Sequence, residues 1–509
     1  MVRKTPFGFF AINEDLPYHV SRGYDRTCHS PAMSVPQTQS PAPEPTKKFD
    51  PSRYTLPYVK FMTENPTIFH AVDAFASKLE AAGFEYLSER KEWDLKPGGK
   101  YYVRRNSSSF IAFSVGRDYK PGNGFGIVAG HIDALCAKLK PVSKVPTKAG
   151  YLQLGVAPYA GAMSSTWWDR DLGIGGRVLV KHNGKVEERL VKLDWPIARI
   201  PTLAPHFGAA AAGPFNPETQ ATPVIGLDNS DLPGQSEAPQ IEIEAGTFAA
   251  TQPPRLVKTI CGALGISDYS SLVNWELELF DTQPAAVGGL DHEFIFAGRI
   301  DDKLCCFAAI EALLESAETN TSSGIIKMVG CFDDEEIGSQ IRQGAQSTFM
   351  SGTIERIIES LGGSGTSVYR QSMANSFLVS SDVIHAVNPN FLGAYLENHS
   401  PRLNIGVAVS ADPNGHMTTD SVSTAFLQRV AEKCGSTLQV FQIRNDSRSG
   451  GTIGPMTSSR LGCRAIDCGI PQLSMHSIRA TTGSLDPGLG VQLYKGFFTH
   501  FEEVDKEFA

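Results

Sequence analysis

Residues 324–339 read GIIKMVGCFDDEEIGS, so four consecutive carboxylates, Asp333 to Glu336, directly follow an apolar run. The run at 325–332 has the length and apolar character of a buried strand. Adjacent like charges repel one another, and no basic residue stands among the next few positions. Either these four acids face water, or a multivalent cation holds some of them.

The composition of the chain narrows the classes of protein to consider. Its 509 residues exceed one ordinary domain, and 41% hydrophobic residues indicate a globular protein with a sizeable core. The net charge is −8 with no basic cluster, which argues against nucleic acid and anionic membranes as partners. No apolar run approaches the roughly 20 residues that span a bilayer, so we expect no membrane insertion.

The nine cysteines are odd in number and scattered, and no two have C-x-x-C spacing. We therefore expect small buried thiols, with neither a zinc–cysteine site nor a disulfide framework.

The pattern along the chain predicts three segments. Residues 1–48 include the Pro/Ser/Gln-rich stretch SVPQTQSPAPEPTKK and read as a disordered or propeptide-like extension without a secretory signal. Residues 142–287 contain short alternating strands and predict a β-rich insertion. In residues 49–141 and 288–509 helical and strand patterns alternate, which predicts an α/β catalytic domain with a central sheet flanked by helices.

Several apolar segments of the α/β part end in polar side chains. In such domains ligands gather at the carboxyl ends of the strands. Two imidazoles with several carboxylates are suited to a pair of divalent metal ions roughly 3.5–4 Å apart, with one bridging carboxylate and another as general base. The segments end in His131 and Asp133, in Asp301, in Glu335 and Glu336, in Asp382, and in His476.

Each position also has an ordinary structural explanation. His131 could be a core or capping residue, and Asp301 or Asp382 could cap the segment that follows it. Asp333 and Asp334 could belong to a solvated loop. The metal hypothesis therefore depends on all five segments together.

The order of these motifs makes a family recognisable. Along the chain stand AGHIDALCAKLKP, STWWDRDLGIGGRV, EFIFAGRIDDKLCCF, FDDEEIGSQIRQGA, SSDVIHAVNPNF, GGTIGP and SMHSIRA. By these motifs the chain resembles the aspartyl aminopeptidase and vacuolar aminopeptidase I family of dinuclear zinc metallopeptidases over about residues 58–508, and is most similar to the fungal vacuolar branch.

The resemblance implies a role for each of these residues. Glu335 matches the general base, and Asp133 matches the carboxylate that orients a ligand imidazole. Asp333 and Asp334 are then flanking residues. Two Zn²⁺ per chain would be held by His131 and Asp382 on one side, by Glu336 and His476 on the other, and by Asp301 between them.

The resemblance also implies an assembly. The β-rich insertion matches a dimerisation domain, and His206 in LAPHFG matches a histidine that reaches the neighbouring subunit's active site. Family members form dodecamers built from dimers, so we expect a homo-oligomer. Relatives with a propeptide in the place of residues 1–48 travel from cytosol to vacuole, which makes both compartments candidates.

The expected activity is release of single N-terminal residues from peptides. The aspartyl branch carries a lysine that can pair with an acidic substrate side chain, and alignment places Ser410 there. With Ser410, Gly451 and Thr452 as substrate-binding residues, we expect neutral residues such as leucine to be preferred. Arg402 could restore aspartyl or glutamyl specificity. The alternative hypotheses are an amidohydrolase or deacylase, and a non-catalytic cargo or assembly particle.

Overall fold

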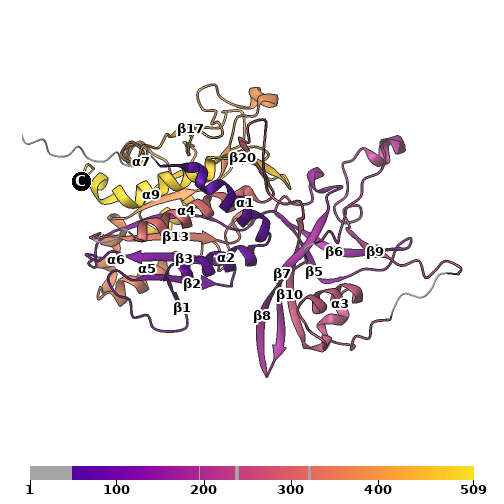
Figure 1. Ribbon diagram of the computed structural model, residues 1–509. Coiled ribbons are helices and arrows are strands. Elements are labelled where there is room, and N and C mark those ends of the chain that lie inside the picture. The colour runs from indigo at the N-terminus through magenta and orange to yellow at the C-terminus, as the bar shows by residue number, and fades with distance from the viewer. Residues whose placement is uncertain (1–48, 194, 235–239, 319–321, 509) are drawn as a thin grey trace, which may run out of the picture. The chain divides into compact units, whose positions relative to one another are not determined.

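A mixed nine-stranded sheet organises the α/β part of the molecule (Figure 1). The computed structural model describes residues 49–193, 195–234, 240–318 and 322–508, and the predicted extension at residues 1–48 lies outside them. The strand order is β1 (Glu85–Leu87), β2 (Lys100–Arg105), β3 (Ser109–Val115), β13 (Ile326–Phe332), β4 (Phe125–His131), β14 (Phe377–Ser381), β18 (Arg464–Gly469), β16 (Ala408–Ser410) and β17 (Gln439–Phe441).

The four central strands β13, β4, β14 and β18 are mutually parallel. Every residue of β4 and β13 is buried, as expected for strands covered on both faces. This explains why both segments read as continuous apolar runs.

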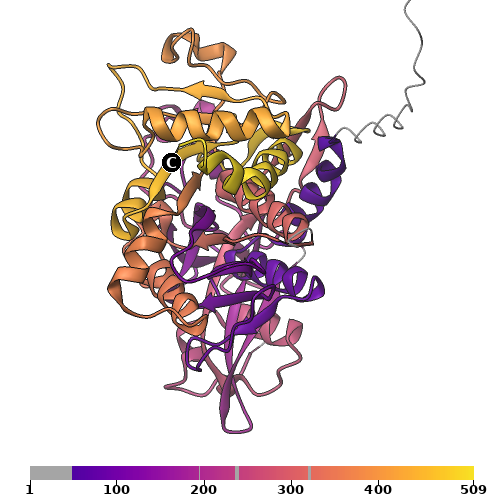
Figure 2. The same ribbon diagram turned by 90° about the vertical axis from the view of Figure 1, so that its left-hand side faces the viewer.

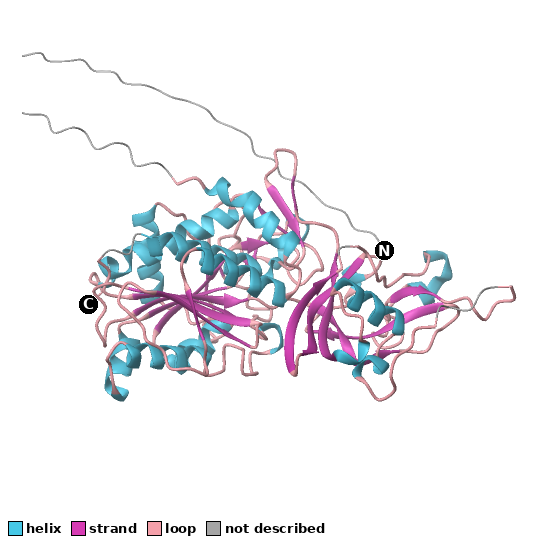
Figure 3. Cartoon of the chain, turned by 60° about the horizontal axis from the view of Figure 1, so that its bottom comes forward, coloured by secondary structure: helices cyan, strands magenta, loops and turns pink. Residues whose placement is uncertain are grey.

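Helices cover both faces of this sheet, as Figure 3 shows. One face carries α1 (Thr55–Glu64), α2 (Ile68–Ala81), α4 (Ile300–Glu318), α7 (Ser421–Cys434) and α9 (Asp486–Asp505), with α4 and α9 in mutual contact (Figure 2). The other face carries α5 (Phe349–Ser360), α6 (Gly365–Ala374) and α8 (Ile453–Leu461). Successive residues of β4 alternate between the two cores, Val128 on one side and Ile127 on the other. The predicted α/β class is confirmed.

A second sheet is antiparallel and has its own hydrophobic core, to which α3 (Pro254–Ala263) contributes. Its strands are β8 (Lys185–Lys192), β7 (Leu172–His182), β10 (Leu272–Asp281), β5 (Cys136–Lys144), β6 (Tyr151–Tyr159) and β9 (Val224–Leu227), in that spatial order.

Two small sheets complete the described structure. One joins β11 (Ala286–Gly288), β12 (Phe294–Ala297) and β20 (Ala480–Gly483), and the other pairs β15 (Ile384–His385) with β19 (Pro471–Gln472). None of the helices in the described part of the chain has the length and apolar character needed to cross a bilayer.

Candidate active site

Three neighbouring parallel strands bring polar side chains to one edge of the large sheet. His131 is the last residue of β4, and Asp382 follows β14 directly. Glu335 and Glu336 lie in a short 3₁₀ helix, η6 (Glu335–Ile337), just after β13. Because these strands are parallel neighbours, their carboxyl ends meet at the same edge.

Asp301 and His476 reach the same place from less regular segments. Asp301 lies at the start of α4 but has non-helical angles, φ −73° and ψ 115°. Its carboxylate contacts two histidines, which distinguishes it from a simple helix cap. His476 follows β19 and has a left-handed backbone, φ 62°.

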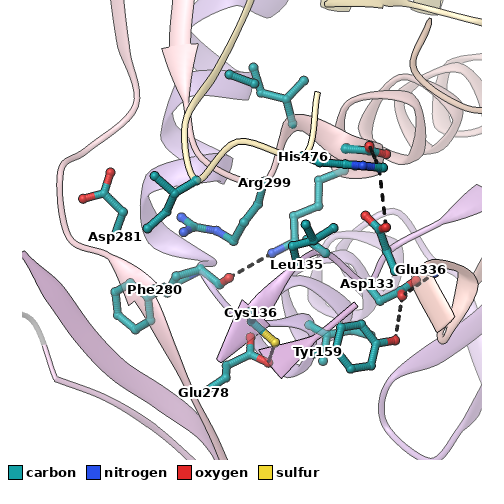
Figure 4. A pocket seen from close by; sticks show the side chains of 18 of the residues that line it. Asp133, Leu135, Cys136, Tyr159, Glu278, Phe280, Asp281, Arg299, Glu336 and His476 are labelled. Atoms are coloured by element: carbon teal, nitrogen blue, oxygen red, sulfur yellow. Dashed lines mark hydrogen bonds and ion pairs between the residues drawn. The ribbon is translucent and has the colours of Figure 1, made fainter. Parts of the chain in front are cut away.

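These residues form two groups that share Asp301: His131, Asp301 and Asp382, and Asp301, Glu336 and His476. Asp301 directs Oδ1 to His131 Nε2 at 3.1 Å and Oδ2 to His476 Nε2 at 3.5 Å. Asp382 Oδ1 is 3.5 Å from His131 Nε2, and Glu336 Oε2 is 3.6 Å from His476 Nε2 (the latter pair in Figure 4). Glu335 Oε2 is 3.8 Å from His131 Nε2 and belongs to neither group.

Carboxylates outnumber the cationic groups of the cluster, which can come only from its two histidines. In the described part of the chain, no lysine or arginine forms an ion pair with its carboxylates. Burial and the nearby Asp301 raise the pKa of Glu336 to about 10, and burial raises the pKa of Glu335 to about 8. Burial opposes a charged His131, but Asp382 and Glu335 outweigh it and raise its pKa well above the ordinary value. Buried oxygen and imidazole donors with unbalanced negative charge fit divalent cations such as zinc.

Asp133 contacts residues at the carboxyl ends of both β4 and β13. Its Oδ1 lies 3.2 Å from His131 Nδ1 and accepts a hydrogen bond from the backbone N–H of Glu335 at 3.2 Å. Its Oδ2 accepts the N–H of Glu336, also at 3.2 Å. This carboxylate therefore contacts both a candidate ligand and the backbone of η6.

Asp333 and Asp334 are not in a solvated loop, the alternative left open by the sequence. Their exposed fractions are 6% and 3%, and the backbone N–H of Asp334 donates to Asp333 Oδ1 at 2.8 Å. Burial raises the pKa of Asp333 to about 8 and that of Asp334 to about 6, so Asp333 retains its proton in neutral solution.

A cavity of about 500 Å³ opens beside the cluster. Ser410, Gly451 and Thr452 all line it, as do the five candidate ligands except His131. The sequence did not predict the rest of its wall, which comes mainly from loops: Val383, Ile384, His385, Met417, Phe441, Ile443, Ser449, Gly450, Asp467, Cys468 and Met475. This lining contains no lysine or arginine, and Arg402 is exposed and lies outside it.

His206 belongs neither to the two groups of donor residues nor to the wall of this cavity. It lies in the exposed 3₁₀ segment Pro205–Ala211, with its ring stacked on Phe207, and lines neither this cavity nor the smaller one in Figure 4.

The backbone of Asp382 is packed tightly against β18. A Cβ atom built on Gly469 would lie 1.4 Å from the carbonyl oxygen of Asp382. Only glycine permits this approach, so the position of Asp382 depends on direct backbone packing.

The chain is similar to known aminopeptidases. Residues 61–498 match the family model described as aminopeptidase I zinc metalloprotease (M18). Vacuolar aminopeptidase 1 of Saccharomyces cerevisiae is 44% identical over 460 residues, covering 89% of each chain. An aspartyl aminopeptidase of Aspergillus oryzae is 38% identical, covering 89% of this chain and 96% of its own.

Solved structures show the same fold. The mApe1 structure of Chaetomium thermophilum is 57% identical with a TM-score of 0.84, covering 90% of this chain and 100% of its own. A Saccharomyces cerevisiae mApe1 dodecamer is 38% identical with a TM-score of 0.80, covering 90% and 99%. The chain therefore belongs to the M18 family of aminopeptidase I zinc metalloproteases, and it is a hydrolase of the exopeptidase class.

Proposed function

We propose that this enzyme releases single neutral residues, such as leucine, from the N-termini of peptides. The observation that carries the proposal is the cavity beside the cluster, whose wall is largely apolar and contains no cationic side chain among its described residues. Aspartyl or glutamyl specificity is the second candidate, because some relatives are named aspartyl aminopeptidase.

We infer two zinc ions per chain. His131 and Asp382 would hold one, Glu336 and His476 the other, and Asp301 would share its two oxygens between them. The two groups of donor atoms support this arrangement. Zinc bound there supplies positive charge that polarises the peptide carbonyl and makes water easier to deprotonate.

In this proposal Glu335 moves the proton. It lines the cavity, contacts His131 only at 3.8 Å, and belongs to neither group of donor atoms. Its pKa of about 8 applies without metal, and positive charge on zinc held by the neighbouring donors would lower it. The ionised carboxylate could then accept a proton from the attacking water and return it to the leaving amine. Asp133, which contacts His131 Nδ1, would keep that imidazole oriented with Nε2 toward the donors.

Substrate selection follows from charge. An aspartyl side chain entering this cavity would lose water without gaining a cationic partner, a cost of several kcal/mol by order of magnitude. A leucyl side chain incurs no such cost and gains about 1.5–3 kcal/mol on burial. Ser410, buried in the wall, offers only a hydroxyl group.

We therefore expect kcat/KM to be at least about tenfold higher for leucyl than for aspartyl or glutamyl anilides, because one buried unpaired charge exceeds 1.4 kcal/mol. The measurement is turnover on a panel of aminoacyl anilides, with zinc analysis of the same sample. Ser410→Lys should shift the preference toward acidic substrates, and Arg402→Ala is the matched control. Faster cleavage of acidic anilides by the unaltered enzyme would overturn the neutral preference.

We also propose that residues 142–287 form a dimerisation domain, and that His206 acts in the neighbouring subunit's site. The exposure of His206 and its absence from the described lining of the two cavities beside the donor cluster support this role. The dodecameric relative supports homo-oligomeric assembly. The relative named vacuolar aminopeptidase 1 supports a vacuolar location, with the cytoplasm as the other candidate.

His206→Phe is then expected to lower kcat by about 10²-fold, the usual scale for one group that stabilises developing charge, with zinc content and native mass unchanged. Mixing His206→Phe with Glu335→Gln under conditions of subunit exchange should restore part of the activity, because a mixed dimer contains one complete site. Phe207→Leu controls for disturbance of the loop. Absence of recovery despite measured exchange would assign each site to a single chain.

A further inference from the structure

The end of β6 brings a tyrosine from the six-stranded sheet to the metal cluster. Tyr159 is the last residue of β6 and pairs in register with Cys136 of β5, three residues after Asp133. Its hydroxyl donates a hydrogen bond to Asp133 Oδ2 at 2.7 Å (Figure 4). Tyr159 is not among the residues predicted from the sequence, although pairing 136–144 with 151–159 as a hairpin would have placed it there.

The bond from Tyr159 is the shortest that Asp133 makes. The other contacts of this carboxylate, to His131 Nδ1 and to the N–H groups of Glu335 and Glu336, are all 3.2 Å long. Shorter hydrogen bonds to an ionised acceptor are the stronger ones. The hydroxyl therefore helps to fix a carboxylate on which three parts of the site depend.

The phenol is itself buried and packed against a lysine. Its exposed fraction is 7%, and Lys138 Nζ lies 4.0 Å from the centre of its ring. Burial and the adjacent Asp133 raise the pKa of Tyr159, so the hydroxyl keeps its proton and acts as the donor. Tyr159 and Asp133 line a small cavity of about 30 Å³ together with other residues of the six-stranded sheet and with Asp301, Glu336 and His476.

We propose that Tyr159 is a positioning residue of the active site: through Asp133 it orients the imidazole of His131 and the backbone that carries Glu335. The inference rests on the proposed zinc aminopeptidase function. It makes the six-stranded sheet part of the catalytic apparatus of its own chain. Tyr159 does not line the cavity assigned to the substrate side chain, so it should affect turnover more than binding.

The test compares Tyr159→Phe with Tyr119→Phe. Tyr119 has the same exposed fraction, 7%, but packs against Phe125 in a different core. Tyr159→Phe should lower kcat on leucyl anilide about 10–100-fold with KM within about twofold, and should speed zinc release to a chelator by a similar factor. Tyr119→Phe should change none of these. Equal kcat and equal zinc release in the two variants would overturn the proposal.

A double-mutant cycle tests the route through Asp133. In an Asp133→Asn background, Tyr159→Phe should change kcat and the rate of zinc release little further. An undiminished effect of Tyr159→Phe in that background would overturn the proposed route. Zinc release is measured without substrate. It therefore supports or overturns the role of Tyr159 even if leucyl anilide is not cleaved.

Discussion

Glu335→Gln is expected to lower kcat by about 10²–10⁴, the range for losing a general base. Glutamine keeps the shape and hydrogen-bonding capacity of the side chain but cannot accept a proton from water. Because Glu335 lies outside both groups of donor atoms, zinc content should stay near two per chain and KM should change little. Steady-state kinetics and metal analysis on the same preparation measure all three quantities.

Asp333→Asn provides the matched control for Glu335→Gln. Asp333 is a buried acid two positions away, and its raised pKa of about 8 means that asparagine resembles the form already present at pH 7. We expect its kcat to stay within about threefold of the unaltered enzyme, on the scale of minor local change. A Glu335→Gln enzyme as active as Asp333→Asn would remove Glu335 from proton transfer.

Asp301→Ala should have the second large effect, loss of at least one zinc ion per chain. Asp301 is the residue shared by the two groups of donor atoms, and without it two dications would face each other with no anion between them. Activity should fall by more than about 100-fold, because losing even a residue that only orients a metal ligand lowers metal affinity or activity by about 10–100-fold. Zinc stoichiometry and kcat are the measurements.

Asp118→Ala, which removes an exposed acid, controls for the loss of one carboxylate. It should retain both zinc ions and full activity. An Asp301→Ala protein that also retained both would eliminate the dinuclear site.

The sequence predicted the parts of the structure that depend on local pattern. The apolar runs ending at His131 and Phe332 are the parallel strands β4 and β13, as their composition indicates. Polar residues at strand ends suggested a metal cluster because parallel strands must place those ends together. These are consequences of periodicity and topology alone.

The features that the sequence did not predict depend on contacts between segments that are distant along the chain. The burial of Asp333 and Asp334 could not be read from four adjacent acids, because it depends on packing by other parts of the chain, including the contact between Asp334 and Tyr159 at 3.5 Å. The wall of the cavity is built largely from loops after β14, β16, β17 and β19, whose paths no periodicity specifies.

The close packing of Gly469 against Asp382 limits how this protein can evolve. All five candidate ligands can be intact in a relative that is nevertheless inactive, because any side chain at position 469 would displace the backbone of one ligand. A survey that scores only the ligands would count such a relative as a working peptidase. The glycine is therefore a marker to score beside the ligands, although it has no side chain with which to bind metal or substrate.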